Sequence, residues 1–110
     1  MLECISFYKD AQSLIVSISC DIDHHAARGI REKIDKKVLQ TRPRVLVLDF
    51  SGVSFMDSSG IGLILGRAEL CRTIGARVNL MGLTPHLYKL VTLSGIERVK
   101  NVSVLMTSGR

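Results

Sequence analysis

Residues 45–67 read VLVLDFSGVSFMDSSGIGLILGR and predict a strand that leads through a turn into a helix. The strand, Val45 to Leu48, is an uninterrupted apolar run, which is typical of a central strand covered on both faces. The helix is expected to begin at Ser58 and to run to about Ile74, with Gly75 as its stop. The side chains expected to point inward are Ile61, Ile64, Leu65, Ala68 and Cys71.

The segments on either side alternate between strand and helix patterns. The expected elements are strands at residues 2–8 and 13–20, a helix capped by Asp23 that runs to about Gln40, the strand and helix described above, a strand at 78–81, a helix capped by Thr84 that ends at Ser94, and a strand at 99–105. The order β-β-α-β-α-β-α-β predicts a single α/β domain over residues 1–110. Its sheet is expected to be mixed but mostly parallel, with helices packed against it. Only a few residues remain for a fourth helix.

The composition is that of a globular protein, with 46% apolar and 23% charged residues. These values exclude disordered, collagen-like and low-complexity chains. No apolar run is long enough for a transmembrane helix and no signal peptide is visible, so we expect a cytoplasmic protein without a membrane partner. Aromatic residues make up only 5% and no nucleic-acid-binding motif is present, so direct nucleic-acid binding is not expected.

Charge and cysteine placement give two further expectations. The net charge is +5, and the excess lies in residues 28–44, where seven Lys and Arg side chains accompany two acids. Such a basic helix favours a solvated face or a docking surface for an acidic partner. Cys4, Cys20 and Cys71 are odd in number and show no metal-ligand spacing, so they are expected to be reduced and mostly buried thiols.

The start of the helix at Ser58 is where chemistry is expected. Asp57 or Ser58 would be the N-cap, and free backbone N–H groups beyond it favour an anion. Gly60 and Gly62 would let a partner's backbone come close, whereas Gly66 is expected to pack against the sheet. No serine-hydrolase elbow surrounds Ser58, and the lysine of a phosphate-binding loop is missing, so at most weak nucleotide binding is expected.

A second polar cluster follows the second strand. It consists of Asp21, Asp23, His24 and His25. A metal site is conceivable, but this sequential spacing is not one that metal ligands usually show. Turn and helix-cap chemistry on a polar surface is the favoured interpretation.

These motifs resemble those of a known family. FMDSSGIG, residues 55–62, resembles the phosphorylation-site motif of STAS domains, the anti-sigma factor antagonists. IDHHAA, residues 22–27, is similar to the family's second motif, usually written GELDHHTA. Thr84-Pro85 and residues 93–96 match its third helix. The similarity covers about residues 12–98, and the double histidine indicates the sporulation branch.

The resemblance implies a partner-switching role. In this family the unphosphorylated protein binds an anti-sigma factor that is also an ATP-dependent serine kinase, which frees the sigma factor. The kinase phosphorylates the serine directly after the motif aspartate, Ser58 here, and a separate serine phosphatase reverses the modification. No enzymatic activity, metal or cofactor of its own is implied. The implied partner-binding residues are Asp21, Asp23, His24, His25, Asp57, Ser58, Ser59, Gly60, Ile61, Gly62 and Thr84.

The chain departs from the family's pattern at three places, of which one is a short C-terminal tail, so that the family's last helix is expected to be stunted or absent. Cys20-Asp21 stands where the family has Gly-Glu, and Arg28-Gly29 stands where the family's first helix often carries acids. The latter departure helps explain the basic bias and could change which kinase is recognised. The alternative role is that of a STAS scaffold or an accessory subunit, of a stressosome-like or a lipid-transport complex, without a sigma-factor function.

Overall fold

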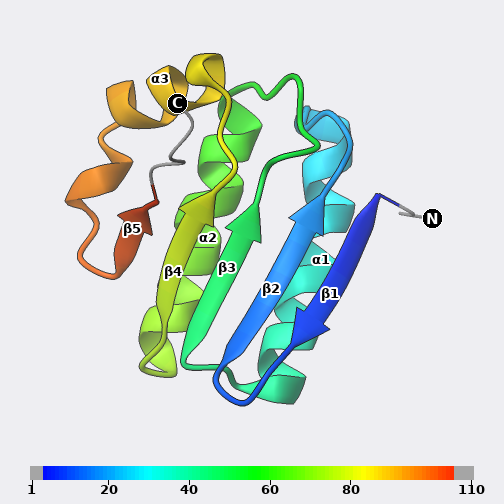
Figure 1. The fold of residues 1–110 in the computed structure, drawn as a ribbon, viewed down its shortest axis with the longest axis vertical. Helices are drawn as coiled ribbons and strands as arrows, with labels where there is room; N and C mark the ends of the chain where they lie inside the picture. The colour runs from blue at the N-terminus through cyan, green and yellow to red at the C-terminus, as the bar shows by residue number, and fades with distance from the viewer. Residues whose placement is uncertain (1–3, 106–110) are drawn as a thin grey trace.

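The computed structural model describes residues 4–105, which form one five-stranded sheet with three α-helices packed against it (Figure 1). The elements are β1 (Ile5–Lys9), β2 (Ser13–Ile18), α1 (His24–Thr41), β3 (Val45–Asp49), α2 (Ser58–Thr73), β4 (Arg77–Met81), α3 (Pro85–Leu93), the 3-10 turn η1 (Ile96–Arg98) and β5 (Val102–Val104). The strands lie in chain order across the sheet. β1 pairs with β2 antiparallel, and all other pairs are parallel. The expected mixed, mostly parallel α/β fold is confirmed.

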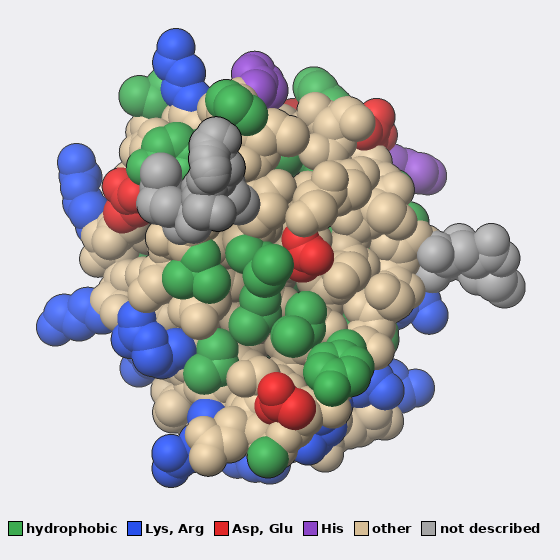
Figure 2. Space-filling view, viewed as in Figure 1, with side chains coloured by type: hydrophobic (Ala, Val, Ile, Leu, Met, Phe, Trp, Pro, Cys, Tyr) green, Lys and Arg blue, Asp and Glu red, His purple; other side chains and the backbone are tan. Residues whose placement is uncertain are grey.

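Strand β3 occupies the centre of the sheet, as its apolar run predicts. Leu46 and Leu48 are fully buried. Figure 1 shows α1 and α2 on the same face of the sheet and α3 at its upper end. The expectation that β3 is covered on both faces is therefore wrong, and Figure 2 shows hydrophobic side chains on the face turned away from α1 and α2. Val47 lies between Leu46 and Leu48 in the strand, so its side chain points to the open face. It is nevertheless only 8% exposed, because it lies between its cross-strand neighbours Ile15 and Asn79.

Helix α2 buries one stripe of side chains, and one of its expected members is misplaced. Ile64, Ala68 and Cys71 are buried as expected, and Ile61 packs against the core from a half-buried position. Leu65 is 43% exposed, so its inward assignment is wrong. Leu63, Ile64 and Leu65 are consecutive, and three consecutive residues cover more of a helix surface than one neighbouring layer can bury.

The carboxyl-terminal elements are shorter than the sequence predicts. Strand β5 holds three residues instead of the expected seven between 99 and 105, because η1 and a turn fill the approach to it. Asn101, in the turn before β5, ties this turn to α2 and to the chain before β4, since its Nδ2 donates to the carbonyls of Ala68 at 2.9 Å and Ala76 at 3.1 Å. The residues left for a fourth helix, 106–110, lie outside the described residues. No helix within residues 4–105 is long and apolar enough to cross a bilayer.

The expectation of three reduced thiols is wrong for two of the cysteines. Cys4 and Cys20 form a disulfide, with their Cα atoms 5.6 Å apart. The hairpin brings them together, because the chain before β1 runs beside the chain after β2, where Ser19 N donates to Cys4 O at 2.8 Å. Cys71 is free and buried as expected, and desolvation by burial raises the pKa of its thiol to about 11.

Candidate functional site

The first turn of α2 presents the expected acceptor serine to solvent. Asp57 is the N-cap, and its Oδ1 accepts a hydrogen bond from Ser59 N at 2.8 Å. Ser58 occupies the first helical position and is exposed, and no residue in the described part of the chain hydrogen-bonds to its hydroxyl. The partial positive charge of a helix N-terminus lies at this point. The Ser58 hydroxyl is therefore accessible, and an anionic group added to it would meet a compatible backbone.

A short backbone bridge holds the starts of α1 and α2 together. Ile22 pairs with Met56 in a parallel bridge, in which Ile22 N donates to Phe55 O at 3.0 Å and Asp57 N donates to Ile22 O at 3.2 Å. Ile22 and Met56 are both buried, which anchors the bridge in the core. The positions of Asp57 and of the α1 N-cap, Asp23, are thereby fixed relative to each other.

The polar cluster after β2 has the cap chemistry that the sequence favours. Asp23 Oδ1 accepts a hydrogen bond from Ala26 N at 2.8 Å and caps α1, while Asp21 is exposed just before it. His24 and His25 begin the helix and are exposed. Within residues 4–105 no three His, Cys, Asp or Glu side chains are grouped so that they could hold a metal ion.

The expected partner-binding residues gather at one edge of the sheet. Because β2, β3 and β4 are parallel, the segments that follow them lie at the same edge. The segments are residues 21–25 after β2, residues 57–62 after β3, and Thr84 after β4. Thr84 Oγ1 accepts from Leu87 N at 3.2 Å and caps α3 as predicted. Gly60 is the buried member of the set, and four members are half-buried, namely Asp57, Ser59, Ile61 and Thr84.

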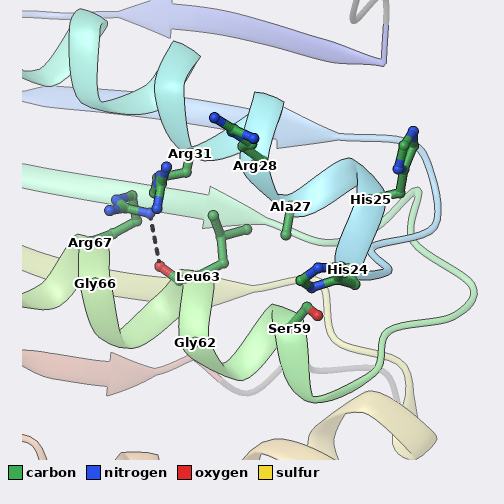
Figure 3. A pocket seen from close by; sticks show the side chains of 10 residues that line it. All are labelled: His24, His25, Ala27, Arg28, Arg31, Ser59, Gly62, Leu63, Gly66 and Arg67. Atoms are coloured by element: carbon green, nitrogen blue, oxygen red, sulfur yellow. Dashed lines mark hydrogen bonds between the residues drawn. The ribbon is translucent and has the colours of Figure 1, made fainter.

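A cleft of about 660 Å³ lies between α1 and α2 and opens beside this edge (Figure 3). We call it the α1–α2 cleft. The α1 wall consists of His24, His25, Ala27, Arg28 and Arg31. Their spacing places most of them on one side of the helix. In Figure 3 the His24 ring lies beside Ser59, whereas His25 points away from Ser59.

The α2 wall of the cleft follows the same helical spacing. It consists of Ser59, Gly62, Leu63, Gly66 and Arg67. Leaving out the nearby backbone of α2 itself, no atom of residues 4–105 lies within 4 Å of a Cβ atom placed at Gly62 or Gly66, so neither glycine packs against another described element. The expectation that Gly66 packs against the sheet is wrong, because its missing side chain faces open space. At Gly60 the added Cβ would collide with Met56, so Gly60 serves internal packing and offers no room for a partner's backbone.

Arg67 is the charged residue that α2 buries. Its Nε lies 2.7 Å from Asp35 Oδ1 in an ion pair, and its Nη1 donates to Leu63 O at 3.3 Å. The Arg67 side chain is 6% exposed and that of Asp35 is 33% exposed. Burial lowers the pKa of Arg67 and the charge of Arg31 lowers it further, whereas Asp35 raises it. Positive charge from two helices therefore converges at this end of the cleft.

Sequence reasoning missed the three arginines of the cleft. In the sequence, Arg67 ends the FMDSSGIGLILGR motif, and Arg28 stands out only as a departure in charge from the family's pattern. The sequence does carry a signal for the α2 wall of the cleft, because helical spacing places four residues on one side of the helix: Ser59, Gly62, Gly66 and Arg67. Gly62 follows Ser59 by three residues, Gly66 follows Gly62 by four, and Arg67 follows Ser59 by eight. Which side of α1 would face that stripe depends on how the helices pack, and the sequence does not determine this.

Comparison with known proteins supports the resemblance seen in the sequence. A model of the STAS domain family matches residues 5–104. The chain is 33% identical over 85 residues to the anti-sigma F factor antagonist of Lysinibacillus sphaericus, covering 77% of this chain and 73% of the relative. It superposes on the unphosphorylated anti-sigma factor antagonist SpoIIAA with a TM-score of 0.77 and 27% identity, over 93% of this chain and 88% of that one. Against Bacillus SpoIIAA in its phosphorylated form the TM-score is 0.69, again at 27% identity, over 93% and 91% of the two chains.

The fold and the site define a small α/β protein that presents a serine at an exposed helix start beside a cluster of helix caps. The match over residues 5–104 and the sequence relatives establish the family. This chain belongs to the STAS domain family. The resemblance expected from FMDSSGIG and IDHHAA is confirmed.

Proposed function

We propose that the unphosphorylated chain is an anti-sigma factor antagonist, which binds an anti-sigma factor that is also a serine kinase and thereby frees the sigma factor. The observation that carries this proposal is the exposed Ser58 hydroxyl directly after the Asp57 cap. The name of the Lysinibacillus sphaericus relative and the similarity to SpoIIAA support the same role. The pathway is proposed to be sporulation, because the double histidine resembles that branch.

Partner binding is assigned to the edge of the sheet described above. Three acids, Asp21, Asp23 and Asp57, lie along it and offer carboxylates to a basic partner. Phe55 is 48% exposed next to them and adds an aromatic contact of the kind that dominates many interfaces. The bridge between Ile22 and Met56 keeps these groups in a fixed arrangement, so little ordering is required on binding.

Phosphorylation of Ser58 would switch this surface off without unfolding it. A phosphoryl group adds about −1.5 to −2 charges and three acceptor oxygens. The helix N-terminus compensates part of that charge, so the fold is expected to persist. A partner docked over the same turn would meet a hydrated dianion beside the Asp57 carboxylate. A loss of about 3 kcal/mol would weaken the complex more than about a hundredfold.

The chain is proposed to supply the surface, while its partners supply the chemistry. The kinase transfers the phosphoryl group to Ser58, and a serine phosphatase removes it. No metal, resident cofactor or turnover of its own is needed for this cycle. Weak nucleotide binding at the start of α2 remains a prediction of the sequence.

The experiment is phosphorylation of the purified chain by its cognate anti-sigma factor kinase with ATP, followed by intact-mass and peptide mass spectrometry. We expect one phosphate on Ser58, none in Ser58→Ala, and an unchanged yield in Ser59→Ala, the matched neighbour. Ser58→Asp is expected to lose binding to the kinase in titration calorimetry. An unmodified chain, in the presence of a kinase active on its own established substrate, would refute the switch and favour a STAS scaffold or accessory subunit.

A further inference from the structure

The α1–α2 cleft has a charge that is opposite to that of the neighbouring site edge. The edge carries Asp21, Asp23 and Asp57, whereas the described residues that line the cleft include three arginines and no Asp or Glu. Arg28 is 3.8 Å from Glu32 in an exposed i,i+4 pair, a type of contact that contributes little. Arg31 forms no ion pair within residues 4–105. Two guanidinium groups on α1 are therefore available to an anionic ligand.

The arginines line a groove that follows the helix axes. Arg28 and Arg31 are three residues apart, so one turn of helix separates them along the cleft. Across the cleft, Gly62 and Gly66 are also about one turn apart, and both face open space. In Figure 3 Arg31 and Arg67 lie at one end of the cleft and His24 and Ser59 at the other. The cleft thus offers guanidinium donors along the α1 wall, while the α2 wall leaves the backbone uncovered at Gly62 and Gly66.

Burial makes the inner end of the cleft favourable for an anion. Arg67 is nearly fully buried, and Asp35 balances only one of the two guanidinium charges that meet there. A carboxylate next to Arg31 would complete the charge balance. Guanidinium groups bind carboxylates through paired hydrogen bonds, and such bonds are stronger than those between neutral groups.

We propose that the α1–α2 cleft is a docking groove for an acidic peptide segment, whose carboxylates pair with Arg28 and Arg31 while its backbone lies against Gly62 and Gly66. The inference rests on the proposed function, because it assigns that segment to the same protein partner that covers Ser58. The partner would then touch two oppositely charged surfaces, an acidic edge and a basic groove. Such a pattern fixes orientation and discriminates against partners that carry only one of the two charges.

The geometry favours a peptide over a small phosphate compound. The guanidinium groups of Arg28 and Arg31 are spaced along a groove, which suits carboxylates repeated along a chain better than one compact anion. Alternate residues of an extended peptide are about 7 Å apart on one side, whereas Arg28 and Arg31 are about 4.5 Å apart along the helix axis, a difference that two long side chains can span. The glycines give a main chain room to approach. None of the described residues that line the cleft is a Phe, Tyr or Trp on which a nucleobase could stack.

The test uses the isolated chain labelled with 15N and three probes at low ionic strength. The first probe is a blocked peptide of alternating Glu and Gly, the second is its Gln and Gly counterpart, and the third is inorganic pyrophosphate. The variant is Arg28→Gln with Arg31→Gln. The matched control is Lys33→Gln with Lys36→Gln, which removes two exposed charges of α1 that do not line the cleft. The amide signals of Gly62 and Gly66 report on the cleft directly.

We expect the Glu peptide to shift both glycine signals saturably, and the Gln peptide to leave them unchanged. The arginine variant should bind about tenfold more weakly, since two exposed ion pairs together supply about one factor of ten. The lysine control should bind like the parent chain. The proposal would be overturned by glycine signals that do not move, by equal losses in both variants, or by pyrophosphate binding as tightly as the peptide, which would indicate a small-anion site.

A second measurement separates this inference from the proposed function. Titration of the anti-sigma factor kinase against the same variants should show weaker binding for the arginine variant than for the lysine control. If the parent chain bound no kinase, the proposed function would fail, while the peptide titration would still decide whether the groove takes acidic segments. If the kinase bound both variants equally, the groove would not belong to that interface, and the inference would fail alone.

Discussion

The three glycines of α2 offer a sharp test of how the structure assigns space around the site. Alanine substitution adds the same methyl group at each position, but the surroundings differ. At Gly60 the new Cβ would collide with the Met56 side chain, which is buried. At Gly62 and Gly66 it would meet no atom within 4 Å in the described part of the chain, the nearby backbone of α2 itself left out. One chemical change should therefore have opposite effects on stability within two turns of helix.

The magnitudes follow from two known terms. Alanine is more favourable than glycine in a helix interior by about 0.8–1.0 kcal/mol, so Gly62→Ala and Gly66→Ala should each raise the free energy of unfolding by nearly that amount. At Gly60 the same gain is offset by overpacking against Met56, which costs about 1–3 kcal/mol or more in a filled core. Gly60→Ala should thus be destabilising by up to about 2 kcal/mol.

The assay is urea unfolding of the three variants, followed by circular dichroism, with the parent chain alongside. A change of 1 kcal/mol corresponds to about 4–8 °C in melting temperature for a chain of this size, so thermal melts give an independent reading. Met56→Ala combined with Gly60→Ala is the matched control, because removing the obstructing side chain should reduce the penalty at Gly60. Destabilisation by Gly62→Ala, or a Gly60→Ala variant as stable as Gly62→Ala, would show that the space around the site is wrongly assigned.

Three further predictions concern the disulfide, the buried ion pair and the buried thiol. Reduction of the Cys4–Cys20 disulfide should lower the free energy of unfolding, measured in urea, by about 3 kcal/mol, because the bond closes a loop with a sequence separation of 16. A variant with serine at both positions is the control, and dithiothreitol should not change its urea unfolding. Asp35→Asn should lower the free energy of unfolding by about 1–3 kcal/mol in the same assay, since it leaves the buried Arg67 charge without its carboxylate partner. Asp35→Glu keeps a carboxylate and should restore part of the loss. Cys71 should resist Ellman's reagent at pH 8 until urea unfolds the chain. Because its folded pKa is raised from 9.0 to about 11, the free energy of unfolding should fall as the pH rises through that window, and less so in Cys71→Ala.

Much of the fold is predictable from the sequence because its signals are local. The sequence predicts helix caps at Asp23 and Thr84 and a third cap at Asp57 or Ser58. In the structure the side chains of Asp23, Asp57 and Thr84 each accept a hydrogen bond from a backbone N–H. Their gathering at one edge follows from the parallel order of the strands. The exposed Ser58 follows from the cap at Asp57.

What the sequence does not predict depends on contacts between distant segments. The Cys4–Cys20 disulfide requires the register of the hairpin, which spacing alone does not give. The role of Gly60 depends on where Met56 points, and Met56 is placed by its bridge to Ile22. The α1–α2 cleft depends on how the two helices pack, because Arg31 and Arg67 approach only through tertiary structure.

A rigid platform is the property that unites the site, the cleft and the proposed switch. The bridge between Ile22 and Met56, the packing of Gly60 on Met56 and the cap at Asp57 all constrain the turn that carries Ser58. A modification on such a turn changes the charge of the surface while the backbone stays in place. An inhibitory effect on partner binding then needs no conformational change, because steric and electrostatic conflict at the covered surface is sufficient. The amide signal of Gly66, about two turns along α2 from Ser58, should accordingly change little when Ser58 is phosphorylated, whereas a refolding mechanism would shift it strongly.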